Sequence, residues 1–227
     1  MKQLLLLLAL CIVTGVAHAQ IQPGNLYLGG TVGGNIQNYD GGYKTASMSF
    51  KPAIGYFLNE NWMAGVSTEL KYTNTESYGT SQQRLVHYDN RSRAVSLGPM
   101  LRYYYSLGTS FSLFCEGTAG LTFVKNKQET EMEAYYSDPY YYSDPYNYHT
   151  GSSTSFNTKQ LFAGFAPGIV FFPKPKLGIE LKTNILTYNR SLDSESDYSS
   201  WNLSSPKTNF SANLSLATTT IGAGFYF

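Results

Sequence analysis

The sequence is poor in cysteine, in net charge and in long apolar runs, and each shortage excludes a class of protein. Its 227 residues include 16 lysines and arginines against 15 aspartates and glutamates, which gives a formal net charge of +1. Neither a basic face for nucleic acid nor an acidic solvating tail is therefore expected. No segment after the N-terminus reaches the roughly 18 consecutive apolar residues that a membrane-spanning helix requires. Long helical periodicity is missing as well.

The N-terminus has the order of a secretory signal peptide. Lys2 gives a charged start, a short apolar run follows, and Ala17-His18-Ala19 is a small-residue cleavage site. This pattern predicts a cleaved signal peptide over residues 1–19 and a mature chain over residues 20–227. Cys115 is then the only cysteine of the mature chain, which excludes an intramolecular disulfide.

Apolar and polar residues alternate with a period of two over nearly the whole mature chain. Tyrosine, glycine, serine and threonine are abundant, and a chain of this length fits one all-β domain. The alternation predicts eight strands, each followed by residues that favour turns. The strands are expected over residues 25–37, 45–57, 62–75, 93–105, 110–127, 156–172, 176–190 and 208–227.

The connections between these strands alternate in length. Tight turns are expected at 58–61, 106–109 and 173–175, and long polar loops near 38–44, 76–92, 128–155 and 191–207. Short turns at one end and long loops at the other are typical of the transmembrane barrels of the bacterial outer membrane. The sequence therefore predicts an all-β fold, an eight-stranded antiparallel up-and-down transmembrane β-barrel. Both termini would be periplasmic and the four loops extracellular.

A weak internal repeat marks the periplasmic ends of four strands. Residues 52–57, 99–104 and 167–172 each begin with proline and end in two aromatic residues, and residues 221–226 follow this form without the proline. We expect these aromatic pairs to form a girdle at one membrane interface. Because proline removes a donor from the ladder, we also expect a β-bulge at each proline. The opposite girdle is expected from Phe50, Tyr72, Phe123, Phe156, Tyr188 and Phe210.

The face opposite the apolar set carries most of the charges of the strands. In the seventh strand, the apolar set is Leu177, Ile179, Leu181 and Ile185. If that set faces lipid, the charges face a lumen that eight strands leave just wide enough for side chains to fill. Because an unpaired buried charge is costly, we predict a largely closed lumen with paired charges; a narrow porin-like channel for small solutes or ions is the alternative. The predicted lumen ion-pair network consists of Lys51, Glu69, Lys71, Arg102, Glu116, Glu180 and Lys182.

Catalytic chemistry has little support in the sequence. Some eight-stranded outer-membrane barrels modify lipid A, which requires a histidine near a serine and an acidic or amide partner. His87 and His149 are the histidines of the mature chain, both fall in expected loops, and neither lies in a recognisable motif. Isolated histidines with scattered aspartates do not make a metal site. We predict no enzyme, no cofactor and no metal, with an outer-membrane lipid-modifying enzyme as the second alternative.

The third expected loop is rich in tyrosine and contains Tyr-Ser-Asp-Pro twice. Tyrosine offers a large amphipathic contact area at low entropic cost, so one interpretation is a binding surface for an extracellular protein, a glycan or the lipopolysaccharide headgroup. The other interpretation is structural: the strands extend above the membrane and the tyrosines cover the exposed hairpin. The candidate contact surface consists of Tyr135, Tyr136, Tyr140, Tyr141, Tyr142, Tyr146 and Tyr148.

The C-terminus completes a resemblance to a known family. Thr220, Gly222, Phe225 and Phe227 form a terminal Thr-x-Gly-x-x-Phe-x-Phe, which resembles the insertion signal in the last strand of outer-membrane barrels. With the signal peptide and the eight-strand rhythm, the whole mature chain resembles the small eight-stranded outer-membrane β-barrels. These include the transmembrane domain of outer-membrane protein A and the porin-like outer membrane β-barrel proteins.

The resemblance implies a location and a set of partners. It implies a monomer integral to the outer membrane, inserted by the barrel-assembly machinery and in contact with outer-membrane lipid and lipopolysaccharide. The role that it implies is structural or one of surface interaction. Nucleic acid is not among the expected partners.

The terminal motif generates a first prediction. Phe227→Ala removes the last aromatic ring of the signal, so we expect insertion to slow severalfold because the machinery recognises the final strand less well. The insertion rate into vesicles that contain reconstituted barrel-assembly machinery measures this effect. Normal assembly of the variant would refute our interpretation of the terminus.

Overall fold

The computed structural model describes residues 21–39, 42–81, 84–134, 149–192, 208–212 and 218–227. The predicted signal peptide and the predicted tyrosine contact surface lie outside these residues. No helix in the described part of the chain is long and apolar enough to cross a membrane. The strands are β1 (Leu26–Tyr39), β2 (Tyr43–Phe57), β3 (Trp62–Ser81), β4 (Arg84–Ser106), β5 (Phe111–Ala134), β6 (His149–Lys174), β7 (Leu177–Thr183), β8 (Leu186–Ser191), β9 (Thr208–Ala212) and β10 (Thr219–Tyr226).

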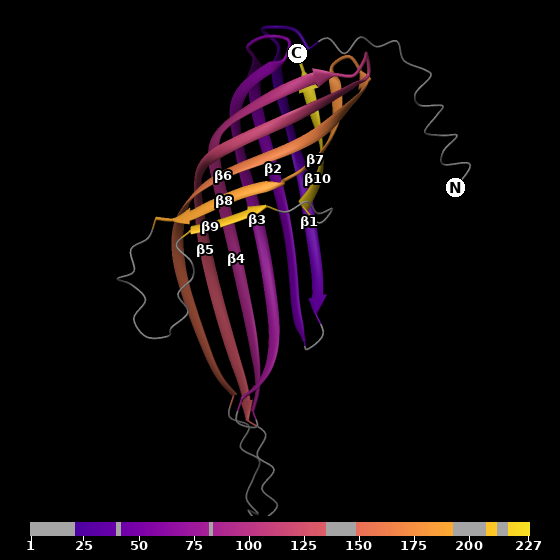
Figure 1. Cartoon of the computed structure of the whole chain (residues 1–227). Helices are drawn as coiled ribbons and strands as arrows, with labels where there is room; N and C mark the ends of the chain where they lie inside the picture. The colour runs from indigo at the N-terminus through magenta and orange to yellow at the C-terminus, as the bar shows by residue number, and fades with distance from the viewer. Residues whose placement is uncertain (1–20, 40–41, 82–83, 135–148, 193–207, 213–217) are drawn as a thin grey trace, which may run out of the picture.

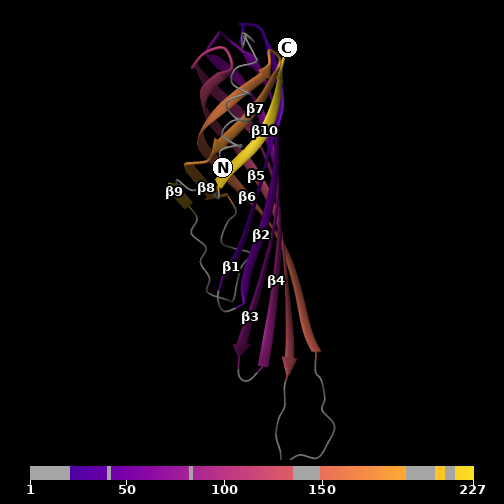
Figure 2. The same cartoon turned by 90° about the vertical axis from the view of Figure 1, so that its right-hand side faces the viewer.

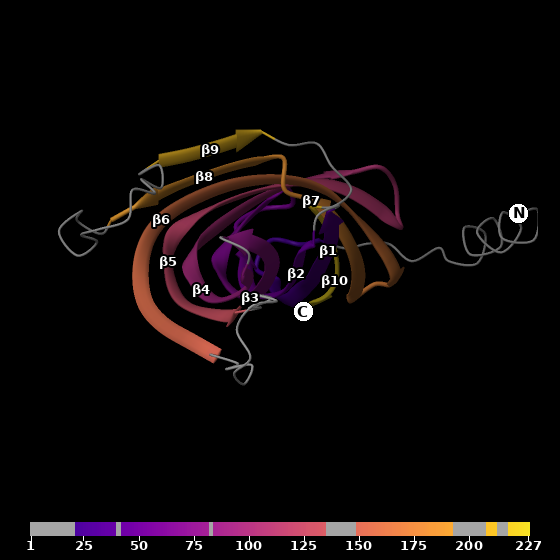
Figure 3. The same cartoon turned by 90° about the horizontal axis from the view of Figure 1, so that it is seen from below.

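Eight of these strands close into a ring. The hydrogen-bonded order is β1-β2-β3-β4-β5-β6-β7-β10, and β10 pairs antiparallel with β1. At the end of this seam the amide of Leu26 donates to the carbonyl of Phe227 over 3.0 Å, and the amide of Phe227 donates to the carbonyl of Leu26 over 2.9 Å. Figure 1 shows the strands from the side, and Figure 3 shows the ring from below. The predicted all-β, eight-stranded antiparallel barrel is confirmed.

The last two predicted strands are each interrupted. β7 and β8 follow one another along the chain where one strand was expected, and so do β9 and β10. β8 pairs with β6 and β9 pairs with β8. Beyond Val32, β1 pairs with β2 alone among the described residues. The ring is therefore continuous at the end of the short turns, and its wall is less regular toward the long hairpins.

A β-bulge separates β7 from β8 and corrects one face assignment. Gly168 of β6 lies opposite Lys182, whereas Phe165 lies opposite Leu186, so the β7–β8 strand has one more residue than β6 over this stretch. One extra residue moves every later side chain to the other face. Leu186 consequently takes the outward place, and Ile185, expected on the lipid face, lines a cavity inside instead. The bulge lies across from Pro167, whose missing amide hydrogen leaves the β6 ladder without a donor there.

The bulges predicted within the proline-containing strands are wrong at Pro52 and Pro99. The register on one side of each proline is the same as on the other side, so no residue is inserted. A bulge would reverse the faces of the strand, and the inward residues Ala53 and Met100 would then turn toward lipid. Each proline therefore removes one hydrogen bond from the ladder, but the inward and outward residues of the strand remain on the same sides. The pairs that bracket the prolines are Phe50 with Leu70, Ala53 with Ser67, Leu97 with Leu121, and Met100 with Thr118.

The outer surface of the ring is apolar. Its exposed large side chains include Leu28, Val32, Ile54, Val66, Leu70, Val95, Leu97, Leu101, Leu121, Leu161, Leu181 and Ile221. We call this surface the apolar band; it suits hydrocarbon rather than water. The prediction is wrong for one member of the expected outer girdle, Phe156. It lies an odd number of residues from the outward Leu161 on β6, so its side chain lies on the inner face, opposite Asn126.

Two hairpins continue well beyond the rest of the ring. β3 and β4 remain paired from Trp62 opposite Tyr103 to Ser81 opposite Arg84, and β5 and β6 remain paired to Glu133 opposite His149. Figures 1 and 2 show β3 to β6 extending past β1 and β2 at the end away from the C-terminus. Much of residues 76–92 and 128–155, expected as loops, is thus β-strand. The extended strands form one sheet in which the inner and outer faces of the barrel continue.

Close backbone contact generates a prediction at Gly98. A Cβ atom added to Gly98 would collide with the carbonyl oxygen of Ala119, whereas one added to Gly79 would meet nothing within 4 Å. We expect Gly98→Ala to lower the free energy of unfolding by about 1–3 kcal/mol through overpacking, and the matched control Gly79→Ala to change it little. Urea unfolding in lipid vesicles measures both. Equal stability of the two variants would contradict the close packing of β4 on β5.

Candidate functional site

The interior of the barrel holds a network of four buried charges, which we call the four-charge network: Arg102, Glu116, Glu180 and Lys182. Arg102 on β4 lies directly opposite Glu116 on β5, and Glu180 and Lys182 are two residues apart on β7. Because side chains alternate along a strand, all four point away from the lipid-facing set. The sequence therefore turns these charges inward by the same alternation that turns leucines outward.

Each charge in this network contacts an opposite charge. Arg102 Nε donates to Glu116 Oε2 over 2.6 Å, and Arg102 Nη1 donates to Glu180 Oε1 over 3.0 Å. Lys182 Nζ donates to both oxygens of Glu116, over 2.8 and 3.0 Å. The side chains are at most 3 % exposed. Two cations and two carboxylates thus neutralise one another, which is the condition for keeping ions out of water at tolerable cost.

Aromatic groups complete the surroundings of Arg102. Its guanidinium carbon lies 4.8 Å from the ring centres of Tyr27 and of Phe114, close enough for cation–π attraction. Its Nη1 also donates to the Tyr104 hydroxyl over 3.1 Å, and the Tyr226 hydroxyl donates to Glu180 over 3.1 Å. Aromatic rings therefore contact the charged groups, which also contact one another.

These rings belong to a buried layer that the sequence analysis missed, which we call the aromatic layer: Tyr27, Phe57, Tyr104, Phe114, Phe172 and Tyr226. Neighbouring rings lie 5.0–6.0 Å apart, as between Phe172 and Tyr226 or between Phe57 and Tyr226. Met63, Met100 and Val170 fill the space around them. The layer lies at the end of the barrel that carries the short turns and the C-terminus.

The aromatic pairs of the internal repeat therefore have two roles. One residue of each pair is outward, as expected for a girdle, and its neighbour is buried inside. A period of two requires this, because adjacent residues of a strand face opposite sides; that signal could have located the aromatic layer. The outward members are Tyr56, Tyr103, Phe171 and Phe225, and the inward members are Phe57, Tyr104, Phe172 and Tyr226.

The other predicted lumen residues lie apart from the four-charge network. Lys51 and Glu69 form a pair at 3.9 Å, with side chains 13 % and 30 % exposed. Lys71 is exposed and forms no ion pair with another described residue. A cavity of about 290 Å³ lies here, toward the long hairpins, and is lined by Asn35, Ser47, Ser49, Glu69, Lys71, Asn184, Thr187 and further polar residues.

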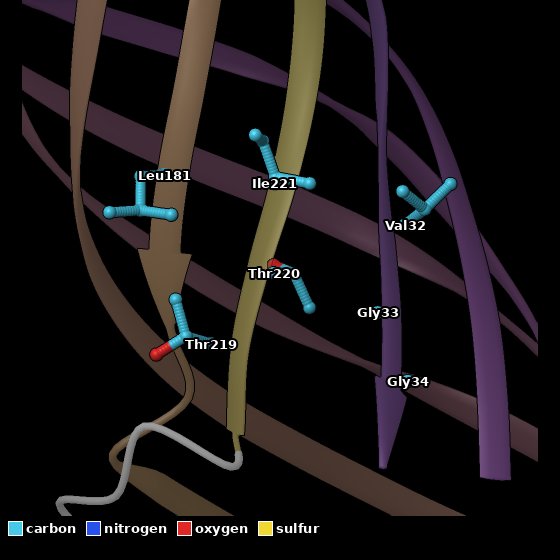
Figure 4. A pocket seen from close by; sticks show the side chains of 7 residues that line it. All are labelled: Val32, Gly33, Gly34, Leu181, Thr219, Thr220 and Ile221. Atoms are coloured by element: carbon cyan, nitrogen blue, oxygen red, sulfur yellow. The ribbon is translucent and has the colours of Figure 1, made fainter.

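A groove of about 320 Å³ lies where the ladder between β1 and β10 ends. Figure 4 shows its lining: Leu181 of β7, Ile221 and Thr220 of β10, and Val32 of β1, which is followed along β1 by Gly33 and Gly34. Thr219 also lines it. Among the described residues, no ionisable side chain lines it. The groove therefore offers apolar contact and no chemistry.

The residues of the predicted insertion signal lie in or directly after β10. Gly222 pairs with Thr31, and a Cβ atom on it would collide with the Gly30 carbonyl. Phe225 and Phe227 are both exposed on the outer surface, with ring centres 6.4 Å apart. The motif thus combines a position where β10 approaches β1 closely with two lipid-facing rings.

The histidine of the second expected loop lies in a strand. His87 is on β4, its ring stacks on Tyr78 at 4.6 Å, and its Nδ1 lies 3.9 Å from Glu131. Its Nε2 has no hydrogen-bond partner among the described residues. Within the same part of the chain, no group of three or more histidine, cysteine, aspartate or glutamate residues is arranged to hold a metal ion.

Comparison with protein families agrees with this geometry. The family model described as "Outer membrane protein beta-barrel domain" matches residues 4–226. The chain belongs to this family. The protein is accordingly integral to the bacterial outer membrane, with its long hairpins extracellular and both termini periplasmic, as the sequence predicts.

Solved structures of other outer-membrane barrels are similar at low identity. Ail, the attachment invasion locus protein of Yersinia pestis, is 16 % identical with a TM-score of 0.40, covering 91 % of this chain and 100 % of that one. OprG of Pseudomonas aeruginosa is 12 % identical with a TM-score of 0.42, covering 92 % and 98 %. A structure of Ail in complex with the heparin analogue sucrose octasulfate is 18 % identical with a TM-score of 0.36, covering 90 % and 97 %. Comparison with curated protein sequences gives no match.

The two carboxylate environments generate a matched prediction. Glu116→Gln leaves two buried cations with a single carboxylate, so we expect the free energy of unfolding to fall by about 3–5 kcal/mol. The same change at the partly exposed Glu69 should cost less than about 1 kcal/mol. Urea unfolding of both variants in lipid vesicles makes the comparison, and equal losses would show that burial does not distinguish the two sites.

Proposed function

We propose that the protein is a non-enzymatic outer-membrane barrel with a closed interior, whose role is structural or one of surface interaction. The observation that carries this proposal is the four-charge network resting on the aromatic layer. Their side chains lie near the periplasmic end of the barrel and are nearly inaccessible to solvent, which supports a closed interior. Eight strands leave little more room than this.

A conducting path would have to cross both layers. It would pass Arg102 and Glu116, which contact one another directly, and then the rings of Tyr104 and Tyr226. An ion on that path would have to break a buried ion pair, which is strongly unfavourable. The polar cavity lined by Glu69 and Lys71 lies on the outer side of this barrier. It supports access of water from outside rather than passage through the barrel.

The extended hairpins support the part of the proposal that concerns the surface. β3 to β6 carry a paired sheet beyond the membrane band, and the tyrosine-rich segment connects β5 to β6. A rigid sheet lowers the entropic cost of presenting such a segment to a partner. An extracellular protein or glycan is the class of partner that this arrangement favours.

The surroundings of His87 support a role without catalysis. Its contacts are the Tyr78 ring and the Glu131 carboxylate, and no serine hydroxyl of the described residues forms a hydrogen bond with it. Acyl transfer by a serine needs that contact. We therefore prefer a structural explanation of His87, in which its ring packs on the outer face of the β3–β4 hairpin.

Conductance measurements test the closed interior. We expect the folded protein to give no stepwise current in planar bilayers, because the two layers block the lumen. A variant that opens both layers should conduct: Phe57→Ala, Tyr104→Ala and Phe172→Ala remove three inward rings, and Arg102→Ala with Glu116→Ala removes the ion pair.

The matched control carries the same Arg102→Ala and Glu116→Ala changes with Tyr56→Ala, Tyr103→Ala and Phe171→Ala, which remove the outward neighbour of each ring. It should remain silent, because the aromatic layer is intact. Heat-modifiable mobility on gels verifies that each variant is folded. Stepwise conductance of the native protein would contradict the proposal and favour the narrow channel.

A further inference from the structure

A block of four basic residues lies on the outward face of the extended sheet, directly beyond the apolar band. We call it the basic block: Arg91 and Arg93 on β4, and Lys125 and Lys127 on β5. Arg93 lies opposite Lys125, and Arg91 lies opposite Lys127. Neighbouring strands are about 4.8 Å apart and successive residues of one face roughly 7 Å apart, so the four side chains start from the corners of a small rectangle.

Half of this block has counter-charges within the protein. Arg91 contacts Asp89 at 2.5 Å and Glu129 at 3.7 Å, and Lys127 contacts Glu129. The bond to Asp89 raises the pKa of Arg91, and the bond from Lys127 lowers the pKa of Glu129. The half of the block that points away from the membrane is thus neutralised by carboxylates beyond it.

The other half has no such partner among the residues that the structure describes. Arg93 and Lys125 are exposed, and neither forms an ion pair or a hydrogen bond with another described residue. Like charges directly opposite one another in a sheet are destabilising. This arrangement therefore favours binding of an external anion between the two side chains.

The position of the unpartnered pair identifies where the anion lies. Two residues nearer the membrane, the outward side chains of β4 and β5 are Val95 and Phe123, which belong to the apolar band. Tyr72 lies opposite Arg93 on β3, and the exposed Lys159 lies opposite Phe123 on β6. Two residues farther out are Arg91 and Lys127, followed by Asp89 and Glu129. The order apolar, basic, acidic places Arg93 and Lys125 at the level of lipid headgroups, where tyrosine is also common.

We propose that Arg93 and Lys125 bind phosphate groups of phosphorylated glycolipid in the outer leaflet of the membrane. A guanidinium and an ammonium on adjacent strands can share one phosphate through charge-assisted bonds. The carboxylates of Asp89 and Glu129 lie farther from the membrane and repel the phosphate groups of the lipid. This repulsion limits the contact to the level of Arg93 and Lys125. A soluble anion would gain nothing from Val95 and Phe123, whereas a lipid places its acyl chains against them.

The test is a titration of the folded full chain in a non-ionic detergent, which brings no phosphate of its own. Native mass spectrometry measures binding of diphosphoryl lipid A and of the same lipid without phosphate. We expect a preference for the diphosphoryl lipid, and we expect the double variant Arg93→Gln with Lys125→Gln to bind it on the order of tenfold to thirtyfold more weakly. Heat-modifiable mobility verifies that the variant is folded.

The matched control is Lys174→Gln with Lys176→Gln, which removes the same charge from exposed lysines at the periplasmic turn between β6 and β7. It should keep the native affinity, and the conservative Lys125→Arg should do so as well. Equal binding of the two lipids, native affinity of the double variant, or an equal loss in the periplasmic control would overturn the proposal.

Two soluble probes separate the lipid from other sources of the same chemistry. Inorganic phosphate and a polysulfated disaccharide are added as competitors of bound lipid A. We expect neither to displace the lipid at concentrations near the dissociation constant of lipid A. Displacement by either would assign the basic block to a soluble anion or to a sulfated glycan and would overturn the assignment to membrane lipid.

Discussion

Neutralisation of charge inside a narrow barrel is the constraint on which the rest of the structure depends. Arg102 and Lys182 meet Glu116 and Glu180 where almost no solvent reaches them, so losing one member leaves an uncompensated buried charge. The four side chains come from β4, β5 and β7, and they meet only in one register. A slip of one residue would turn a whole strand inside out. The network therefore fixes the alignment of these strands while it fills the lumen.

The same alternation organises the surroundings of the network. Each aromatic pair gives one ring to the membrane interface and one to the interior, so the girdle and four of the six rings of the aromatic layer come from the same four strand ends. Where Pro167 weakens the ladder, the bulge before Leu186 places Leu186 rather than Ile185 on the lipid face. Farther out, β3 to β6 continue the faces of the barrel, which brings the basic block to the rim of the apolar band. Closure of the barrel, the orientation of its side chains and the proposed contact with lipid headgroups thus all follow from the alternation of inward and outward residues.

Much of this could be predicted from the sequence, because a period of two is a local property. The strands, the outward leucines and the inward charges all follow from it. Which charges meet is not local: Arg102 joins Glu116 and Glu180 while Lys51 joins Glu69, and the pairing depends on register and depth across several strands. The bulge that moves Ile185 to the inner face can be predicted only when the pairing with the opposite strand is known. The same is true of the unbroken register at Pro52 and Pro99. Polar composition indicated loops for residues 76–92 and 128–155, although exposed hairpin strands use the same residues.

The measurement that tests the central claim most directly is a double-mutant cycle on Arg102 and Glu116, which are joined at 2.6 Å. The single variants Arg102→Met and Glu116→Met and the double variant are unfolded with urea in lipid vesicles. Each single change leaves a net charge in the interior, whereas the double change leaves Lys182 and Glu180 balanced. The structure predicts that the double variant is less destabilised than the sum of the singles, by a coupling free energy on the order of 2 kcal/mol. Additive losses, within about 0.5 kcal/mol, would contradict the view that neutralisation of these charges holds the barrel together.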